Sequence, residues 1–156
     1  MSAMGKLELK IPPVVVWLAL ALLMKLAAGL TSRFSFPALR QPLLTIGLVV
    51  VGVLIALLGV VAFRRARTTV DPRYPEKMSA LVTSGIYRVT RNPMYLGMLV
   101  VLAGWALWLG QLLPFLFLPL FVAILNRWQI MPEERALDRM FGASFATYRT
   151  SVRRWI

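Results

Sequence analysis

The chain has 156 residues, of which 59% are hydrophobic, and its mean hydropathy of +0.73 is far above that of an ordinary soluble domain. It contains no Cys and no His, which excludes disulfides, thiolate nucleophiles and metal sites built on those ligands. The net charge of +12 is compatible with nucleic-acid binding, but the long apolar runs favour a basic face on a membrane instead. We therefore expect one all-α integral membrane domain over residues 1–156, with neither a metal nor a nucleic-acid partner.

Two apolar segments in the N-terminal half predict membrane-spanning helices, over 11–30 and 42–63. Both are long enough to cross a hydrocarbon core of about 30 Å at about 1.5 Å per residue. Two lysines precede the first segment, as in a signal peptide, but no small-x-small cleavage site follows, and an uncleaved anchor is expected. In the second segment Gly52 and Gly59 lie seven residues apart on one helix face, which predicts close packing against a neighbouring helix.

A nearly continuous apolar run over 94–125 is too long for one ordinary span. The pair Gly110-Gln111 interrupts it, which predicts a helical hairpin with arms over 93–109 and 112–128. Pro114 and Pro119 should distort the second arm near its outer end. The chain is thus expected to have about four transmembrane helices.

Basic residues predict the orientation of these helices. The loop between the first two segments carries only Arg33 and Arg40. Many more lie after the second and fourth segments: Arg64, Arg65, Arg67, Arg73, Lys77, Arg88, Arg91, Arg127, Arg135, Arg139, Arg149, Arg153 and Arg154. By the positive-inside rule, both termini and the loop over 64–92 face the cytoplasm. A bacterial inner membrane with anionic lipids is the expected setting.

The C-terminal region carries one apolar stripe with spacings of 3, 1, 4, 3, 4 and 3 residues: Leu137, Met140, Phe141, Phe145, Tyr148, Val152 and Trp155. This spacing predicts an amphipathic helix over 132–155. Pro132 suits its first position, and Glu133 and Glu134 suit its first turn, where the helix dipole favours acids. In the simplest interpretation this helix lies on an anionic leaflet and the acids serve only the dipole.

The stretch TSGIYRVTRNPMYLG, over 83–97, runs from a basic loop straight into the third apolar segment. Its structural interpretation is a helix start, with Asn92 as N-cap, Pro93 as first helical residue and Arg91 as an interfacial anchor. Together with the acid pair, however, it brings Arg, Asn, Tyr and Glu to the boundary between membrane and water. An enzyme that binds a water-soluble cofactor and modifies a lipid-like substrate would need such groups there.

Residues 81–155 resemble the isoprenylcysteine carboxyl methyltransferase family and the related phospholipid N-methyltransferases. Those enzymes carry the segment G-x-Y-x-x-x-R-H-P-x-Y-x-G, which in this chain reads GIYRVTRNPMYLG. A helical hairpin follows, and then E-E-x-x-L…F-G-x-x-Y/F-x-x-Y, which in this chain reads EERAL…FGASFATYRTSVRRW. Asn92 stands where the family has His. Asn keeps hydrogen-bonding groups but does not titrate, so an acid or base role is not carried over to this position.

The resemblance implies a transmembrane methyltransferase that uses S-adenosyl-L-methionine in a cytosolic pocket. By resemblance the pocket is lined by Ala80, Leu81, Val82, Tyr87, Asn92, Pro93, Met94, Tyr95 and Glu133. Arg91, or the helix start at Pro93, would meet the cofactor carboxylate. Glu133 or Glu134 would pair with the ammonium or lie near the sulfonium. The chain has no glycine-rich dinucleotide fingerprint, so a soluble-type methyltransferase fold is not expected.

The implied reaction is in-line methyl transfer to an isoprenoid or other amphiphilic acceptor. A carboxylate or thiolate acceptor needs no base at neutral pH, whereas a protonated amine does. Without His, the bases left are Glu133, Glu134 and solvent, which favours O- or S-methylation over N-methylation. Glu133 and Arg127 are the candidate catalytic residues, and Arg127 or Gln129 would orient the acceptor. Arg127 equally suits a snorkelling anchor.

Two other functional classes remain open. One is a nicotinamide-dependent intramembrane reductase, since some sterol reductases have a similar C-terminal architecture on a much longer chain. The other is a small four-helix transporter or scaffold without enzymatic activity. A proton-coupled transporter is expected to hold an acid inside a span. The only ionisable residue in the middle of a span is Lys25, whose side chain can snorkel.

Overall fold

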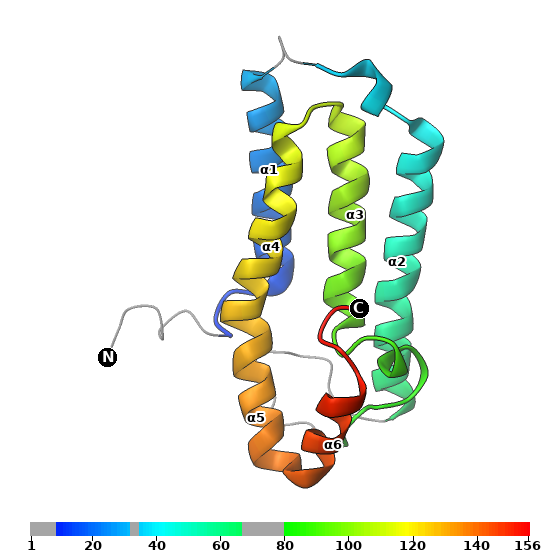
Figure 1. The fold of residues 1–156 in the computed structure, drawn as a ribbon, viewed down its shortest axis with the longest axis vertical. Coiled ribbons are helices and arrows are strands. Elements are labelled where there is room, and N and C mark those ends of the chain that lie inside the picture. The colour runs from blue at the N-terminus through cyan, green and yellow to red at the C-terminus, as the bar shows by residue number, and fades with distance from the viewer. Residues whose placement is uncertain (1–8, 32–34, 67–79) are drawn as a thin grey trace, which may run out of the picture.

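The computed structural model describes residues 9–31, 35–66 and 80–156 (Figure 1). Within these ranges the chain is helical and has no strand, so the predicted all-α class is confirmed. The α-helices are α1 (Pro13–Leu30), α2 (Pro42–Arg65), α3 (Pro93–Leu109), α4 (Phe117–Leu125), α5 (Met131–Phe141) and α6 (Ala143–Ser151). Short 3-10 turns lie at Pro37–Leu39, Gly85–Arg88 and Leu113–Leu116, and a π-helix lies at Asn126–Ile130. Four basic residues used for the orientation fall outside the described ranges: Arg33, Arg67, Arg73 and Lys77.

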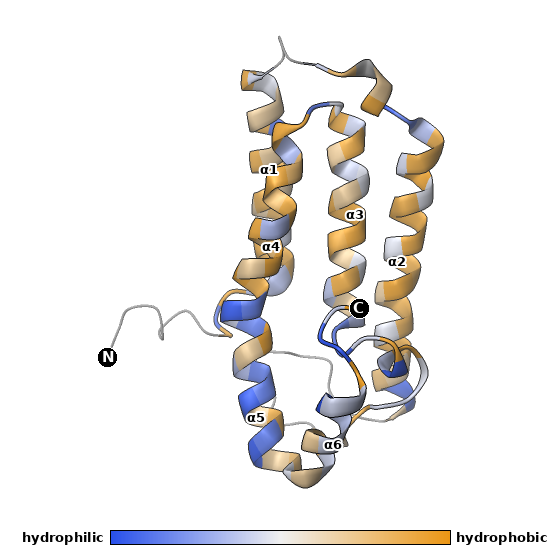
Figure 2. Ribbon diagram, viewed as in Figure 1, coloured by the Kyte–Doolittle hydropathy of each residue, from blue (hydrophilic) through white to orange (hydrophobic). Residues whose placement is uncertain are grey.

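Three helical stretches among the described residues are long and apolar enough to cross a membrane: Pro13–Leu30, Pro42–Arg65 and Leu113–Phe141. The fourth predicted span, α3, is apolar but shorter. The four stand side by side, with α3 between α2 and the pair formed by α1 and α4 (Figure 1). Apolar residues cover most of the bundle, and polar residues gather around α5 and the nearby loop and tail (Figure 2). These features describe an integral membrane protein with its polar groups concentrated at one end.

Small residues let α2 and α3 approach until their backbones touch. A Cβ atom added at Gly52 would lie 2.6 Å from the carbonyl oxygen of Gly97. Seven residues after Gly97, Gly104 faces the carbonyl of Thr45, toward one end of the helix pair. Seven residues after Gly52, Gly59 faces Pro93, toward the other end. Thr45, Gly52 and Gly59 repeat every seven residues, so they form one face of α2. The packing predicted for the two α2 glycines is confirmed.

The hairpin turns where the sequence predicts it. Gly110 ends α3 with φ of +68°, a conformation that glycine adopts without the steric cost of a side chain. Its carbonyl accepts a hydrogen bond from the backbone N–H of Phe36 at 2.9 Å. The side chain of Gln111 is buried, and its Oε1 accepts a hydrogen bond from the hydroxyl of Thr31. Pro114 lies in the 3-10 turn that opens the second arm, as predicted, whereas Pro119 lies in the first turn of α4, where proline is tolerated.

The second arm does not end at residue 128, and Pro132 does not begin a separate helix. The chain is helical without a break over 29 residues, from Leu113 to Phe141. At about 1.5 Å per residue this helical rod is about 43 Å long, more than a hydrocarbon core, so part of it stands outside. Pro132 has no N–H for the carbonyl of Trp128, four residues earlier. The backbone N–H of Leu9 donates to that carbonyl instead, at 3.0 Å, within the π-helix.

The prediction of one amphipathic helix over 132–155 is wrong. α5 and α6 are separate helices, because Gly142 adopts φ of +48° and the chain reverses there (Figure 1). The stripe therefore folds back on the protein rather than lying flat on a leaflet. Its second half packs in one cluster with the end of α2 and the loop before α3: Phe63, Val82, Tyr87, Phe145, Tyr148 and Val152.

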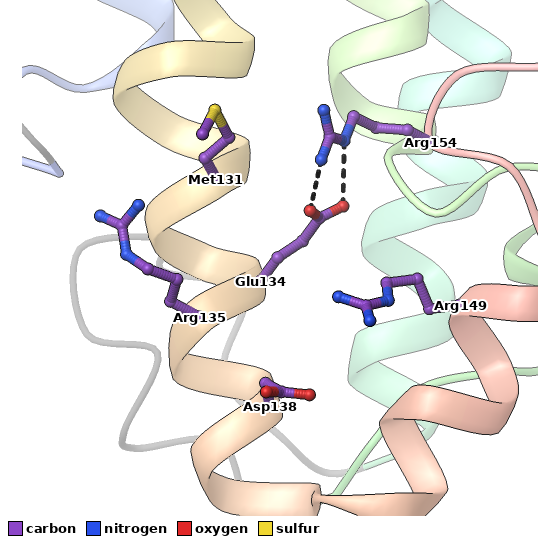
Figure 3. A pocket seen from close by; sticks show the side chains of 6 residues that line it. All are labelled: Met131, Glu134, Arg135, Asp138, Arg149 and Arg154. Carbon is purple, nitrogen blue, oxygen red and sulfur yellow. Dashed lines mark hydrogen bonds and ion pairs between the residues drawn. The ribbon is translucent and has the colours of Figure 1, made fainter.

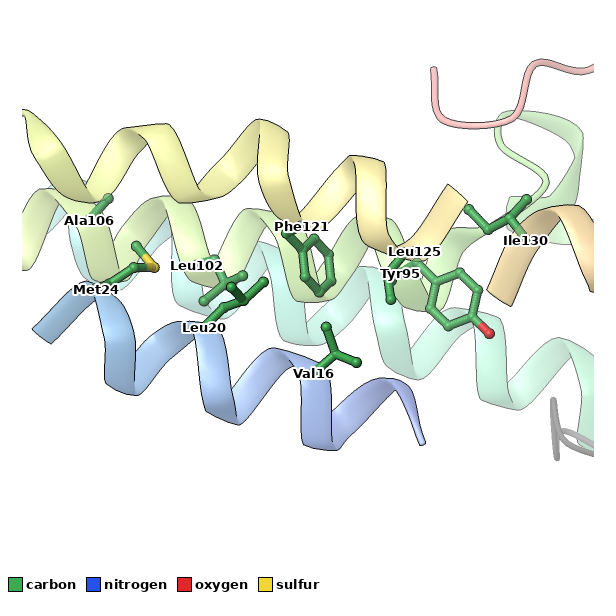
Figure 4. Close-up of a cluster of buried hydrophobic side chains, with 9 residues drawn as sticks. All are labelled: Val16, Leu20, Met24, Tyr95, Leu102, Ala106, Phe121, Leu125 and Ile130. Atoms are coloured by element: carbon green, nitrogen blue, oxygen red, sulfur yellow. The ribbon is translucent and has the colours of Figure 1, made fainter. Parts of the chain in front are cut away.

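The main core lies where α1, α3 and the rod meet. Its buried members are Val16, Leu20, Met24, Tyr95, Leu102, Ala106, Phe121, Leu125 and Ile130 (Figure 4). Tyr95 is the polar tip of this core, at the start of α3. The second cluster, around Tyr87 and Tyr148, lies at the basic end of the bundle. Residues singled out from the sequence belong to both clusters, with Tyr95 in the first and Val82 and Tyr87 in the second.

Candidate functional site

The two sequence motifs meet at a contact between α3 and the rod. The hydroxyl of Tyr95 donates a hydrogen bond to Oε1 of Glu133 at 2.5 Å, across 38 residues of sequence. Tyr95 is 6% exposed, so its ring is held by the main core. Glu133 lies in the first turn of α5 and is partly buried. The phenol of Tyr95 thereby fixes the position of the Glu133 carboxyl group.

Glu134, the second acid, is held by two arginines. Its carboxylate accepts hydrogen bonds from Nε of Arg154 at 3.0 Å and from Nη2 of Arg154 at 2.5 Å (Figure 3). Nη1 of Arg91 lies 3.2 Å from its Oε1. The side chains of Arg91 and Glu134 are only 11% and 14% exposed. Glu134 therefore already has cationic partners, unlike the predicted arrangement in which it pairs with a cofactor ammonium.

Arg91 is not saturated by this ion pair. Its Nε and Nη1 atoms are buried and make no hydrogen bond to any described residue. Burial lowers the pKa of Arg91, the carboxylate of Glu134 acts in the opposite direction, and Arg154 adds to the lowering. A buried donor without an acceptor is unfavourable, more so when it carries charge. The guanidinium of Arg91 is therefore suited to accept a further anionic partner.

The C-terminal residues clasp the loop before α3. Nδ2 of Asn92 donates to the carbonyl of Arg154 at 2.9 Å, and the hydroxyl of Thr90 donates to the same oxygen at 3.3 Å. The backbone N–H of Arg91 donates to the carbonyl of Arg153 at 3.0 Å. Asn92 occupies the predicted N-cap position of α3, but its side chain makes no capping hydrogen bond. Its amide instead holds the C-terminal residues, through the hydrogen bond to the carbonyl of Arg154.

The clasp continues to the rod. Nε1 of Trp155 donates to Oδ1 of Asn126, in the π-helix, at 3.1 Å. Trp155 also packs against the main core. The C-terminal segment thus connects the loop at Thr90 to the rod at Asn126, and it passes in front of the start of α3 in the view of Figure 1.

On the side of α2, the second cluster consists of apolar and aromatic residues. The hydroxyl of Tyr148 donates to the carbonyl of Tyr87 at 2.6 Å, and the rings of Phe63 and Tyr87 meet edge to face with centroids 5.4 Å apart. Burial raises the pKa of Tyr148 to about 12 and also raises that of Tyr87, so both phenols are neutral at pH 7. Val82 is buried in the same cluster.

The other residues predicted to bind the cofactor lie next to the second cluster. Leu81 and Met94 are partly buried against the second cluster, and Pro93 is buried against Gly59 of α2. Ala80 is partly buried at the start of the last described range. The predicted residues of the loop and of the start of α3 thus pack against the second cluster and α2, and Tyr95 connects this part of the chain to Glu133.

The two predicted acceptor residues lie in the π-helix. Gln129 is 1% exposed, and its Nε2 donates to the carbonyl of Ile11 at 2.6 Å. Its Oε1 is buried without a hydrogen-bond partner among the described residues. Gln129 precedes Glu133 by four residues, so both project from similar sides of the rod. Arg127 precedes Glu133 by six residues, which is about 9 Å along the rod at about 1.5 Å per residue.

Sequence reasoning did not single out Arg154, Thr90 or the Trp155–Asn126 contact. In the sequence, Arg154 is one of many basic residues that indicate the cytoplasmic side, and it is 20 residues from Glu134. The only available signal was the acid pair itself, since a carboxylate at an apolar boundary requires a cation or a donor. Which arginine supplies it depends on the reversal at Gly142, which the helical spacing does not reveal.

An open cleft of about 200 Å³ lies beside the ion pair of Glu134 and Arg154 (Figure 3). It is lined by Met131, Glu134, Arg135, Asp138, Arg149 and Arg154. In the described ranges no three His, Cys, Asp or Glu side chains gather as metal ligands would. The chemistry that this end of the bundle offers is therefore anion binding by arginines beside a carboxylate held by a phenol.

Comparison with known proteins gives a consistent set of relatives. The family model described as phospholipid methyltransferase matches residues 40–144, which include α2, α3 and the rod. The chain is 30% identical over 138 residues to protein-S-isoprenylcysteine O-methyltransferase A of Arabidopsis thaliana, covering 86% of this chain and 70% of that protein. It is 41% identical over 63 residues to an uncharacterized protein of Haemophilus influenzae, covering 40% of this chain and all of that protein. No solved structure matches.

Proposed function

The chain belongs to the phospholipid methyltransferase family of membrane proteins, and from this we propose that it transfers a methyl group from S-adenosyl-L-methionine to a lipid-like or isoprenoid amphiphile. The observation that carries the proposal is the hydrogen bond between Tyr95 and Glu133. It joins the RNPMY segment to the acid pair across 38 residues, so both motifs contribute to one place. The buried donors of Arg91, in the same RNPMY segment, suit an anionic ligand.

The residues present fit the charges of this cofactor. Arg91 is proposed to bind its carboxylate, because a guanidinium fork pairs well with that group. Glu133, whose position Tyr95 fixes, is proposed to accept hydrogen bonds from its ammonium. The loop and start of α3 are proposed to surround the remainder: Ala80, Leu81, Val82, Tyr87, Asn92, Pro93, Met94 and Tyr95. When bound, S-adenosyl-L-methionine supplies an electrophilic methyl group on a positively charged sulfur.

The residues of the chain would act on this reaction by positioning and by excluding water. Transfer would form a bond from the acceptor atom to the methyl carbon and break the carbon–sulfur bond, with the former sulfonium released as the neutral thioether of S-adenosylhomocysteine. A carboxylate or thiolate acceptor ends neutral, and no proton has to move. Because the chain has no His, we propose O- or S-methylation rather than N-methylation.

The acceptor is proposed to reach the site from the membrane. Arg127 would attract an anionic head group, and the buried Oε1 of Gln129 would accept a hydrogen bond from a donor on the acceptor. The site lies at the basic end of the bundle, where Arg64 and Arg65 close α2. We propose that this end faces the cytoplasm of a bacterium, where anionic lipids of the inner leaflet complement the net charge of +12.

Calorimetry on the purified protein in detergent tests the proposed cofactor. S-adenosylhomocysteine should bind with a dissociation constant of about 1–10 μM, corresponding to roughly 7–8 kcal/mol, and NADPH should give no heat of binding. The reverse preference would identify a reductase and contradict the proposal. Binding of neither compound by folded protein would favour a transporter or scaffold.

A further inference from the structure

Arg91, Glu134 and Arg154 do not form an evenly shared ion-pair network. Glu134 is bound by Arg154 through two hydrogen bonds, at 3.0 Å and 2.5 Å. Its contact with Arg91 is 3.2 Å long, yet Nη1 of Arg91 makes no hydrogen bond. The attraction between Arg91 and Glu134 is therefore charge without hydrogen-bond alignment, and it is the weaker of the two interactions.

The guanidinium of Arg91 has hydrogen-bond donors that no described residue satisfies. Nε and Nη1 of Arg91 are both buried and make no hydrogen bond to any described residue, and the side chain is only 11% exposed. Two arginines also face a single carboxylate, so the three side chains carry an excess positive charge. A second carboxylate would both fill the free donors and balance that charge.

A second carboxylate on Arg91 would compete with Glu134. Two carboxylates on the same guanidinium nitrogen repel each other strongly at a separation of about 4 Å in a partly buried place. Glu134 can leave Arg91 without losing a hydrogen bond, because Arg154 retains its two. Displacement from Arg91 is therefore less costly than a shared arrangement.

We propose that Glu134 is the internal occupant of a carboxylate subsite on Arg91, and that the carboxylate of the cofactor's amino-acid part displaces it. This inference rests on the proposed function and deepens it, since it changes the role of one of the two acids. Glu133 attracts the cofactor, whereas Glu134 competes with it. Arg154 is a positioning residue that draws Glu134 aside. The unbound protein thus keeps a buried cation neutralised until its ligand arrives.

The experiment compares two probes by calorimetry. S-adenosylhomocysteine carries the carboxylate, and 5′-methylthioadenosine lacks the whole amino-acid part. Glu134→Gln should tighten the binding of S-adenosylhomocysteine about tenfold, since the competing negative charge beside Arg91 is removed. It should leave the binding of 5′-methylthioadenosine unchanged, which also shows that the variant is folded. Asp138→Asn is the matched control, because it removes a charge from the same cleft and should change neither affinity.

Two further variants keep the proposal open to refutation if Glu134→Gln does not fold. Arg154→Gln should weaken binding of S-adenosylhomocysteine alone, because Glu134 is then left to Arg91. In an Arg91→Gln background, Glu134→Gln should give no gain.

A selective loss of S-adenosylhomocysteine binding in Glu134→Gln would make Glu134 a direct partner of the ammonium. It would overturn this inference while leaving the proposed function standing. An equal change for both probes, or a gain that persists without Arg91, would overturn it too. If the unaltered protein bound neither probe, the proposed function itself would fail.

Discussion

Glu133→Gln should weaken the binding of S-adenosylhomocysteine about ten- to a hundred-fold, because charged hydrogen bonds contribute about 1.5–3 kcal/mol. The substitution keeps the side-chain shape and an oxygen that can accept the Tyr95 hydroxyl. It therefore removes the group that can carry a negative charge beside the cofactor ammonium, with little effect on the thermal midpoint. Calorimetry and a melting curve on the same sample measure both quantities.

Tyr95→Phe is the matched control for this experiment. It removes only the donor that fixes Glu133, so the loss of affinity should be smaller than for the charge change. If Glu133→Gln lowered stability slightly and left binding unchanged, Glu133 would serve only the dipole of α5. The two motifs would then meet for structural reasons.

Gly97→Ala should lower the free energy of unfolding strongly, because Gly97 lies where α2 and α3 come closest. The new Cβ would collide with the carbonyl of Gly52 and with Ala56, both on α2. Backbone atoms cannot rotate away, so α2 and α3 must separate, at a cost of about 1–3 kcal/mol. The thermal midpoint in detergent should fall clearly.

Gly47→Ala is the control within the same helix pair, since a Cβ at Gly47 meets nothing within 4 Å. It should leave the midpoint unchanged or raise it slightly, because Ala is the better helix former. Equal midpoints for Gly97→Ala and Gly47→Ala would show that the close approach of α2 and α3 does not contribute to stability.

The membrane helices could be predicted because their signals are local. An uncharged apolar run of sufficient length defines α2, and Gly110 ends α3 with its own backbone conformation. The facing of Gly52 and Gly59 toward α3 also follows from their spacing. Such features need no knowledge of the rest of the chain.

The break at Gly142 could not be predicted in the same way. The apolar spacing continues across it in helical register, so periodicity alone indicates one helix. What decides the reversal is distant in sequence, namely the packing of Phe145 and Tyr148 on Phe63 and Tyr87. Pro132 misled for a related reason, because the carbonyl it leaves unpaired is satisfied by Leu9 from the other end of the chain.

The candidate site likewise has one part that could be predicted from the sequence and one part that could not. The proximity of Tyr95 and Glu133 follows from the order and spacing of two motifs that resemble a known family, and their roles remain predictions. The pairing of Glu134 with Arg154 has no such signal. It depends on how α6 returns to the loop before α3, so only the folded arrangement reveals which acid is already neutralised.

The central claim is tested most directly by following the methyl group itself. Purified protein is incubated with S-adenosyl-L-methionine labelled in its methyl group and with a bacterial lipid extract that contains isoprenoid acids and thiols. The label should appear in a lipid-soluble product, with an equal amount of S-adenosylhomocysteine, and Glu133→Gln should reduce both. Folded protein that binds S-adenosylhomocysteine but transfers no label to any lipid-soluble acceptor would contradict the account.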